Sequence, residues 1–457
     1  MNTDLAQTLA QIVGAEHVST AQAYRAQHAK DQSSHTAHLP DVVVWPESTA
    51  QVSQIARHAN AQGIAITGWG AGSSLEGNSI PLRGGIVIDF GRMNQLLTVH
   101  QQDFQATVQP GIFYKDMNKQ LARNGLFFAP DPGANASIGG MIANNAAGTR
   151  TVKYGATRDN VLALEVVLAN GEVIRTGSRS VKQSAGYDLT HLFTGSEGTL
   201  GLITEATLKL HPLPEHFSAV VASFDNTPDA ADAVYAVIGS GLNPAALELL
   251  DAASVRFMNM RVTSLPEKPT LLMEFHGASQ AAIEAELALV REVCDECKCS
   301  RFEAGVGRAE RDRLWEGRHA LGEILFSVYP ESTYLITDVA VPISAYPALA
   351  AYANGLYAEM GLHGALFGHA GDGNLHTVNF APKADAAQQV RLQEFNDRVV
   401  QKAIELDGTC TGEHGVGIGK QKYLVYEHGE AAVEVMRQVK RLFDPRGILN
   451  PGKVVSG

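Results

Sequence analysis

Three histidines and one carboxylate lie in two short glycine-rich segments of the chain. The segment GHAGDGNLH places His369 and His376 seven residues apart around a tight turn, and the segment TGEHG adds Glu413 and His414. Two histidines with one carboxylate form an open site for a divalent metal, which leaves positions for a substrate. A lone histidine is more often an ordinary surface or core residue, so both interpretations stand on spacing alone.

Three further glycine-rich stretches predict a second kind of site. The first, residues 68–77 (GWGAGSSLEG), follows an expected strand and can direct backbone N–H groups toward an anion. Its spacing matches neither the dinucleotide fingerprint GxGxxG nor a triphosphate-binding loop that ends in GK[ST]. The others are residues 132–148 and 193–205. Three such stretches in one region favour an extended cofactor that contains a pyrophosphate.

Short apolar runs separated by turns predict alternating strands and helices after the first 40 residues. Ser48 with Gln51 resembles a capping box for a helix that ends at Gly63, and Asn170-Gly171 predicts a hairpin turn. The expected strands are residues 42–45, 64–67, 85–89, 106–108, 161–168, 172–175 and 203–210.

The composition changes after residue 215. Residues 216–360 contain only 8 glycines and read as long amphipathic helices between strands such as 270–275, which predicts a second α+β domain. A last helix is predicted from an apolar stripe that stops before Asp444-Pro445, formed by Val433, Met436, Val439 and Leu442.

Composition excludes several classes of function. A chain of 457 residues predicts two or three domains, and a net charge of −12 argues against a nucleic-acid partner. We expect neither a transmembrane segment nor a signal peptide, and a cytoplasmic location, with peripheral attachment at the inner face of the membrane left open. The cluster Cys294, Cys297 and Cys299 lacks a nearby fourth ligand, so we interpret the four cysteines as reduced thiols.

Five blocks of sequence occur in a specific order: GAGSSLEG, PGANASIGGMIANNAAG, KYGATRDNV, GSEGTLGLIT and FDPRGILNPGK. Together they resemble the vanillyl-alcohol-oxidase (PCMH-type) superfamily of FAD-linked oxidoreductases. The nearest branch contains D-lactate dehydrogenases, glycolate oxidase flavin subunits and D-2-hydroxyglutarate dehydrogenases. The resemblance covers about residues 40–457.

This resemblance implies an α+β fold, with a PCMH-type two-subdomain FAD-binding domain and an α+β cap domain built on an antiparallel sheet. The expected parts are an N-terminal helical segment (1–39), the FAD-binding domain (40–215), the cap or substrate domain (216–410) and a C-terminal segment that returns to the FAD domain (411–457).

The resemblance also implies which residues bind FAD. No histidine or cysteine lies in the first loop, so we expect noncovalent FAD. The implied FAD-binding residues are Gly70, Gly72, Ser73, Ser74, Leu75, Pro132, Gly133, Ser137, Gly140, Asn144, Gly148, Tyr154, Gly155, Ile203 and Asn450.

The resemblance assigns chemical roles to the histidine segments. His369, His376 and Glu413 would hold Zn²⁺ or Mn²⁺, and His414 would contact the substrate as the general base. Arg318 would bind the substrate carboxylate, and we expect Asn374 to contact the substrate. The implied reaction oxidises a D-2-hydroxy acid, foremost D-lactate to pyruvate, by hydride transfer to flavin N5 with metal-assisted deprotonation of the hydroxyl.

Several alternatives stay open. In the 2-hydroxyglutarate enzymes a lysine precedes the aspartate that aligns with Asp338, whereas here Ile336 and Thr337 precede it, which favours a monocarboxylate. The alternatives are a glycolate oxidase flavin subunit, a D-2-hydroxyglutarate dehydrogenase and, in another class, a non-catalytic FAD-binding redox partner. The expected electron acceptor is a cytochrome, a quinone or an electron-transfer flavoprotein, and a homodimer is left open.

Overall fold

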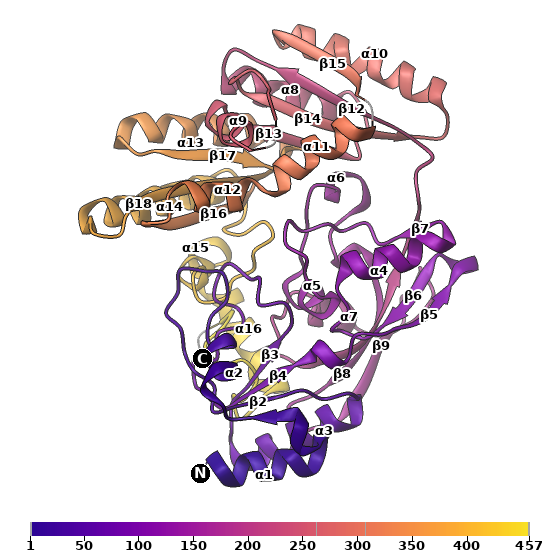
Figure 1. Cartoon of the computed structure of the whole chain (residues 1–457), viewed down its shortest axis with the longest axis vertical. Coiled ribbons are helices and arrows are strands. Elements are labelled where there is room, and N and C mark those ends of the chain that lie inside the picture. The colour runs from indigo at the N-terminus through magenta and orange to yellow at the C-terminus, as the bar shows by residue number, and fades with distance from the viewer. Residues whose placement is uncertain (1, 262, 307, 456–457) are drawn as a thin grey trace. The chain divides into compact units, whose positions relative to one another are not determined.

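The computed structural model describes residues 2–261, 263–306 and 308–455, which divide into two compact units (Figure 1). Unit 1 contains the chain up to Ala147, Ala156–Leu213 and the segment from Glu413 onward. Unit 2 contains Pro214–Gly412 together with the short segment Gly148–Gly155. The chain therefore leaves unit 1 twice and returns to it each time.

The first sheet of unit 1 has four strands in the order β1-β2-β4-β3, and the last three of these are parallel. The helix α3 (Thr49–Gln62) covers it with the expected apolar stripe. The side chain of Ser48 accepts from the backbone N–H of Gln51, and Gly63 ends the helix at φ +67°, so both predicted helix signals are confirmed. The strands are β1 (Val18–Ser19), β2 (Val42–Val44), β3 (Ile66–Trp69) and β4 (Ile86–Asp89).

The second sheet of unit 1 is antiparallel, with the order β5-β6-β10-β8-β9. The predicted hairpin turn at Asn170-Gly171 joins β8 to β9. The strand β5 was not predicted, because its partly exposed residues show no clean alternation. The strands are β5 (Leu96–His100), β6 (Gln105–Val108), β8 (Val161–Val167), β9 (Val173–Gly177) and β10 (Leu202–Lys209), and a separate pair is β7 (Leu126–Phe127) with β11 (His211–Pro212).

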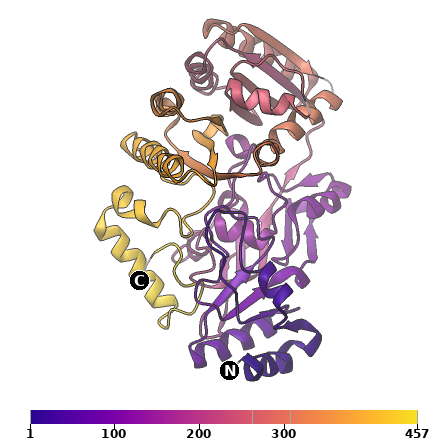
Figure 2. The ribbon, with the colours of Figure 1, turned by 60° about the vertical axis from the view of Figure 1, so that its left-hand side comes forward.

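The remaining helices of unit 1 come from the whole length of the chain. Figure 2 shows the yellow C-terminal segment beside the indigo and purple parts of the same unit. These helices are α1 (Asn2–Val13), α2 (Gln22–Gln27), α4 (Tyr114–Leu121), α5 (Ile138–Asn144), α7 (Leu189–Phe193), α15 (Leu424–His428) and α16 (Glu430–Phe443).

The predicted apolar stripe on α16 is wrong at Leu442. Val433 is buried and Val439 packs against the core of unit 1, but Leu442 is 77% exposed. Phe443 packs in its place, with its ring 5.4 Å from that of Phe193. Successive residues of a helix are rotated by about 100°, so Leu442 lies off the face that Val439 and Phe443 share.

Unit 2 is built on a seven-stranded sheet in which all neighbouring strands are antiparallel, as predicted for the cap. Its order is β15-β12-β14-β13-β17-β18-β16. The strands are β12 (His216–Ser223), β13 (Ala246–Leu250), β14 (Thr270–Gly277), β15 (Arg301–Val306), β16 (Ser332–Ala340), β17 (Gly364–Gly368) and β18 (Asn374–Pro382).

The apolar residues on one face of this sheet pack against α9, α11 and α12. Its helices are α6 (Thr151–Tyr154), α8 (Thr227–Gly239), α9 (Ala252–Asn259), α10 (Gln280–Glu296), α11 (Arg308–His319), α12 (Leu321–Val328), α13 (Tyr346–Met360) and α14 (Ala386–Glu405). All four cysteines are free thiols, and Cys294 is buried near the end of α10. Among the described residues, no helix combines the length and the apolar composition needed to cross a bilayer.

A buried ion pair fixes the C-terminal segment to unit 1. Asp444 is 2% exposed and accepts from Lys440 Nζ at 2.5 Å and from the backbone N–H groups of Ile448 and Leu449 at 3.0 and 2.7 Å. The same ammonium donates to the carbonyl oxygens of Thr199 and Leu449, both at 2.8 Å. One carboxylate therefore holds the end of α16 and the residues that follow it.

Replacing this carboxylate should cost much more than breaking an exposed ion pair on the same helix. We expect Asp444→Ala to lower the free energy of unfolding by about 3–5 kcal/mol, because the largely buried ammonium of Lys440 loses its carboxylate partner. Glu434, whose pairs with Arg437 and Arg441 are solvent-exposed, supplies the control Glu434→Ala, with little expected change. Urea denaturation measures both, and equal losses would contradict the role of Asp444.

Candidate functional site

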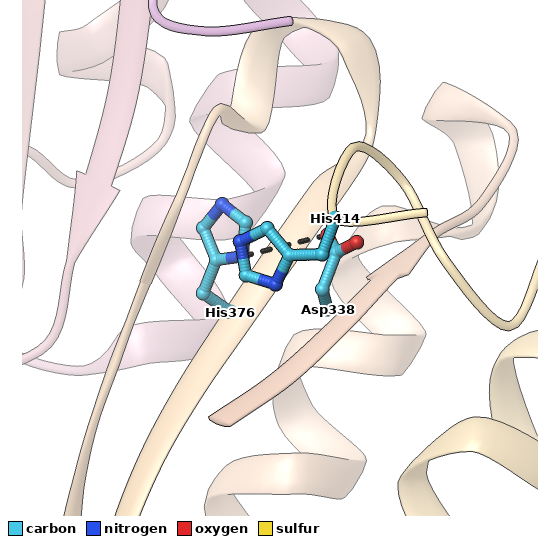
Figure 3. Close-up of side chains that lie close together, drawn as sticks. All are labelled: Asp338, His376 and His414. Carbon is cyan, nitrogen blue, oxygen red and sulfur yellow. Dashed lines mark ion pairs between the residues drawn. The ribbon is translucent and has the colours of Figure 1, made fainter. Parts of the chain in front are cut away.

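Two strands of unit 2 place His376 directly opposite Asp338. The residues face each other in the register of β18 with β16, and His376 Nδ1 lies 3.5 Å from Asp338 Oδ1 (Figure 3). Asp338 is fully buried and accepts hydrogen bonds from Thr411 Oγ1 at 2.9 Å and from Asn374 Nδ2 at 2.8 Å, but His376 Nδ1 makes no hydrogen bond to it. Asp338 thus orders the chain around Asn374 and Thr411 and lies close to the ring of His376.

The two histidines that the sequence placed seven residues apart meet in the fold. His369 follows β17, and its ring centroid lies 5.2 Å from that of His376, with the rings nearly perpendicular at 87°. The two residues are 7% and 4% exposed. The turn between β17 and β18 therefore brings two imidazoles into one buried cluster, as a pair of metal ligands requires.

A glutamate that was not predicted as a site residue joins His369 to Arg318. Glu248 lies on β13 and is fully buried; Oε1 is 2.6 Å from His369 Nδ1, and Oε2 accepts from Arg318 Nε at 2.6 Å. Burial would raise the pKa of Glu248, but the charges and hydrogen bonds of Arg318 and His369 outweigh it and lower that pKa. A single glutamate within the apolar strand ALELL was the available signal.

Part of the guanidinium group of Arg318 makes no hydrogen bond within the described residues. The residue is 6% exposed and its guanidinium carbon lies 4.7 Å from the centroid of the Phe367 ring. Its Nη2 atom is buried and has no hydrogen-bond partner among the described residues. A buried charged donor without a partner is costly, so this geometry suits a bound carboxylate.

Asn374 shows the same feature with an acceptor. Its Nδ2 donates to Asp338 Oδ1 and to the carbonyl oxygen of Val339, both at 2.8 Å, whereas its buried Oδ1 has no partner within the described chain. Gly412 passes so close that a Cβ there would lie 2.2 Å from Asn374 Nδ2. Only glycine therefore fits at the position before Glu413.

Unit 1 holds the backbone of Glu413 and His414. Asn144 Nδ2 donates to the carbonyl oxygen of Glu413 at 2.8 Å, and Asn78 Nδ2 donates to that of His414 at 3.4 Å. The buried carboxylate of Glu197 accepts from Asn78 and from the two backbone N–H groups that follow at residues 416–417. Burial raises the pKa of Glu197 in spite of these hydrogen bonds.

The first two glycine-rich stretches meet within unit 1. A Cβ at Gly70 would lie 2.2 Å from Ser137 Oγ, and one at Gly140 would lie 3.1 Å from the same atom. Gly72 has φ +64°, a conformation that side chains disfavour, and a Cβ at Gly133 would meet nothing within 4 Å. The glycines therefore allow a close approach of two backbone segments, and the backbone at Gly133 borders open space.

The first loop also fits a pyrophosphate. Within the described residues, no backbone N–H group of residues 71–74 donates a hydrogen bond to the protein. Successive N–H groups of this kind are the donors that bind phosphate oxygens. The side chain of Ser74 is already used, because its Oγ donates to Asp31 at 2.9 Å. The residues present therefore fit the phosphate groups of FAD through their backbone.

The other residues implied for FAD lie in three places. Asn450 Nδ2 donates to the carbonyl oxygens of Asn78 and Glu197, which links it to the segment that holds His414. Ile203 belongs to the core of unit 1, and Ser73, Leu75 and Pro132 lie in its first two glycine-rich stretches. Gly148, Tyr154 and Gly155 fold with unit 2, where Tyr154 OH lies 2.8 Å from His276 Nδ1.

Two profiles of known protein domains match the chain. The profile of the C-terminal domain of FAD-linked oxidases matches residues 213–454, and that of an FAD-binding domain matches residues 40–177. The first covers more than half of the chain.

Curated relatives match nearly the whole chain. A probable mitochondrial D-lactate dehydrogenase of Danio rerio is 40% identical, over 97% of this chain and 90% of the relative. A mitochondrial D-lactate dehydrogenase [cytochrome] of Arabidopsis thaliana is 40% identical, over 94% and 76%. The glycolate oxidase subunit GlcD of Bacillus subtilis is 37% identical, over 99% and 96%.

Solved structures confirm the fold. 4-Ethylphenol oxidase from Gulosibacter chungangensis superposes with a TM-score of 0.81 at 18% identity, covering 99% of this chain and 96% of that one. p-Cresol methylhydroxylase superposes with a TM-score of 0.77 and the same identity and coverage. The predicted PCMH-type fold and the predicted family are thus confirmed: the chain belongs to the FAD-linked oxidases and is an FAD-dependent oxidoreductase.

Proposed function

We propose that this oxidoreductase is a D-2-hydroxy-acid dehydrogenase that oxidises D-lactate to pyruvate. The observation that carries the proposal is the buried Nη2 of Arg318, which has no partner in the described chain and belongs to the same Glu248-centred cluster as His369. A 2-hydroxy acid presents a carboxylate to such a donor. The D-lactate dehydrogenases among the relatives support the choice of substrate.

Each polar side chain has a distinct task in this proposal. Arg318 binds the substrate carboxylate through its free guanidinium nitrogen, and Asn374 offers its unpartnered Oδ1 to the substrate. His414, in its neutral form, accepts the proton of the hydroxyl group. When bound, FAD supplies the N5 atom that accepts the hydride from C2 of the acid.

The donor set also fits a divalent metal, which we propose as Zn²⁺ or Mn²⁺. Its ligands would be His369, His376 and Glu413, and it would lower the pKa of the substrate hydroxyl. The close, nearly perpendicular rings of the two histidines support this assignment. Glu413 is the next residue after Gly412, so their Cα atoms are about 3.8 Å apart.

The sheet next to the histidines supports a small substrate. Side chains alternate between the two faces of a strand, so Tyr334 and Ile336 share a face with Asp338. Ile336 is opposite Val378, and Tyr334 is opposite Phe380. Ile336, Val378 and Phe380 pack in the core of unit 2 and offer no donor for the second carboxylate of 2-hydroxyglutarate, which favours lactate.

A glycolate oxidase flavin subunit is the second candidate, because GlcD matches over almost the same length. It would use the same carboxylate and metal chemistry. A non-catalytic redox partner is less well supported, because it leaves the buried Arg318 donor without a task. The cytochromes in the names of the relatives support a cytochrome as the acceptor. The cytoplasmic location stays a prediction, since several relatives are mitochondrial.

Anaerobic bleaching of the flavin absorbance tests the substrate. We expect D-lactate to bleach the purified protein fastest, D-2-hydroxyglutarate to bleach it much more slowly, and L-lactate to leave it oxidised. Rapid bleaching by glycolate with none by D-lactate would replace the first proposal by the second. Inactivity toward all four acids would contradict the proposed function.

Removing the general base should stop turnover without removing the cofactor. We expect His414→Ala to lower kcat for D-lactate by about 10²–10⁴-fold while the flavin absorbance stays unchanged. The exposed His363, which lies before β17, provides the control His363→Ala with wild-type kcat. Steady-state kinetics measure both, and a kcat for His414→Ala close to that of the control would show that another group takes the proton.

A further inference from the structure

Helix α11 carries two arginines, seven residues apart, that each contact a glutamate of the sheet in unit 2. Arg311 pairs with Glu274 on β14, and Arg318 pairs with Glu248 on β13. Seven residues are close to two helical turns, so both side chains leave α11 from the same face. Both are arginine–glutamate pairs, but the two guanidinium groups differ in how many of their nitrogens have a hydrogen-bond partner.

The pair at Glu274 is closed. Arg311 Nε donates to Oε2 at 2.9 Å, Nη2 donates to Oε1 at 3.0 Å, and Nη1 donates to Asp312 at 2.6 Å. Glu274 Oε1 also lies 2.5 Å from His276 Nε2. Each nitrogen of the Arg311 guanidinium therefore has a protein partner, which is the arrangement of a structural clamp.

The pair at Glu248 is open. Arg318 reaches Oε2 through Nε alone, and its Nη2 stays without a partner in the described residues. The second oxygen of Glu248 is occupied by His369 Nδ1. One fully buried carboxylate thus contacts two groups to which the proposed function gives different tasks, and both contacts are 2.6 Å long.

We propose that Glu248 is a positioning residue that orients Arg318 toward the substrate carboxylate and His369 toward the metal, an inference that rests on the proposed function. A carboxylate accepts at both oxygens, so it serves an Arg Nε–H and a His Nδ1–H at once. The hydrogen bond at Nδ1 keeps the proton there and leaves the lone pair of Nε2 for a metal. Glu248 therefore fixes the tautomer of His369 and the direction of the Arg318 guanidinium group.

The variant Glu248→Gln tests this role, because it changes the number of acceptors and hardly changes the volume. Glutamine has one acceptor oxygen, and its NH₂ group can only donate. If the NH₂ faces His369, the ring must accept at Nδ1 and carry its proton on Nε2; if it faces Arg318, the guanidinium loses its anchor. We expect Mn²⁺ affinity to fall at least 10-fold, the KM for D-lactate to rise at least 10-fold, or both.

The matched control is Glu274→Gln, which removes one acceptor from the carboxylate that pairs with Arg311 of the same helix. We expect its Mn²⁺ affinity and D-lactate KM to stay within 2-fold of the wild type. Mn²⁺ affinity is measured by electron paramagnetic resonance of the free ion, and flavin content by absorbance. Equal behaviour of the two variants would overturn the proposal.

A second variant keeps the test decisive if Glu248→Gln fails to fold. Glu248→Asp retains the charge and both acceptors but is one methylene shorter, so it cannot hold both donors at their present positions. We expect the same loss of Mn²⁺ affinity or of D-lactate affinity, and wild-type values in a folded Glu248→Asp protein would overturn the proposal.

The proposed function and the role of Glu248 can be contradicted separately. Wild-type protein whose flavin no 2-hydroxy acid reduces would contradict the proposed function, whatever the variants do. Wild-type protein that oxidises D-lactate, with a Glu248→Gln variant of unchanged metal and substrate affinity, would contradict only the role of Glu248.

Discussion

The buried carboxylate of Glu248 is the constraint on which the polar cluster of unit 2 depends. An ionised group with no exposed surface persists only where donors compensate it, and here Arg318 and His369 do so at 2.6 Å each. Arg318 is buried beside Phe367, so its positive charge in turn needs the carboxylate of Glu248. Arg318 satisfies Glu248 through Nε, and its buried Nη2, which has no hydrogen-bond partner among the described residues, is the donor that the proposed function assigns to the substrate carboxylate.

The chain returns from unit 2 to unit 1 between Gly412 and Glu413. Thr411 and Gly412 are fixed against Asp338 and Asn374 in unit 2, whereas the backbone that follows is held by Asn78, Asn144 and Glu197 in unit 1. The predicted metal ligand and the predicted base, Glu413 and His414, are the first two residues after this change. Each unit thus fixes its own side of one peptide bond.

Local signals predicted much of the fold and part of the site. The capping residues of α3, the hairpin at residues 170–171 and most strands of unit 1 were predicted because caps, turns and alternation act over a few residues. The strand β5 was missed because its partly exposed residues show no clean alternation, and Leu442 was wrongly included in the stripe of α16 although helical rotation places it off the face of Val439 and Phe443. Glu248 was missed because its partners are distant in the sequence: it lies 70 residues from Arg318 and 121 from His369.

The position of a bound metal tests the account most directly. Crystals equilibrated with Zn²⁺ and measured at the zinc absorption edge should give one anomalous peak about 2.0–2.1 Å from Nε2 of His369, with His376 and Glu413 as further ligands. Nδ1 of His369 should stay bonded to Glu248 in the same crystals. A peak on Nδ1 of His369, or no peak at these residues, would contradict the account.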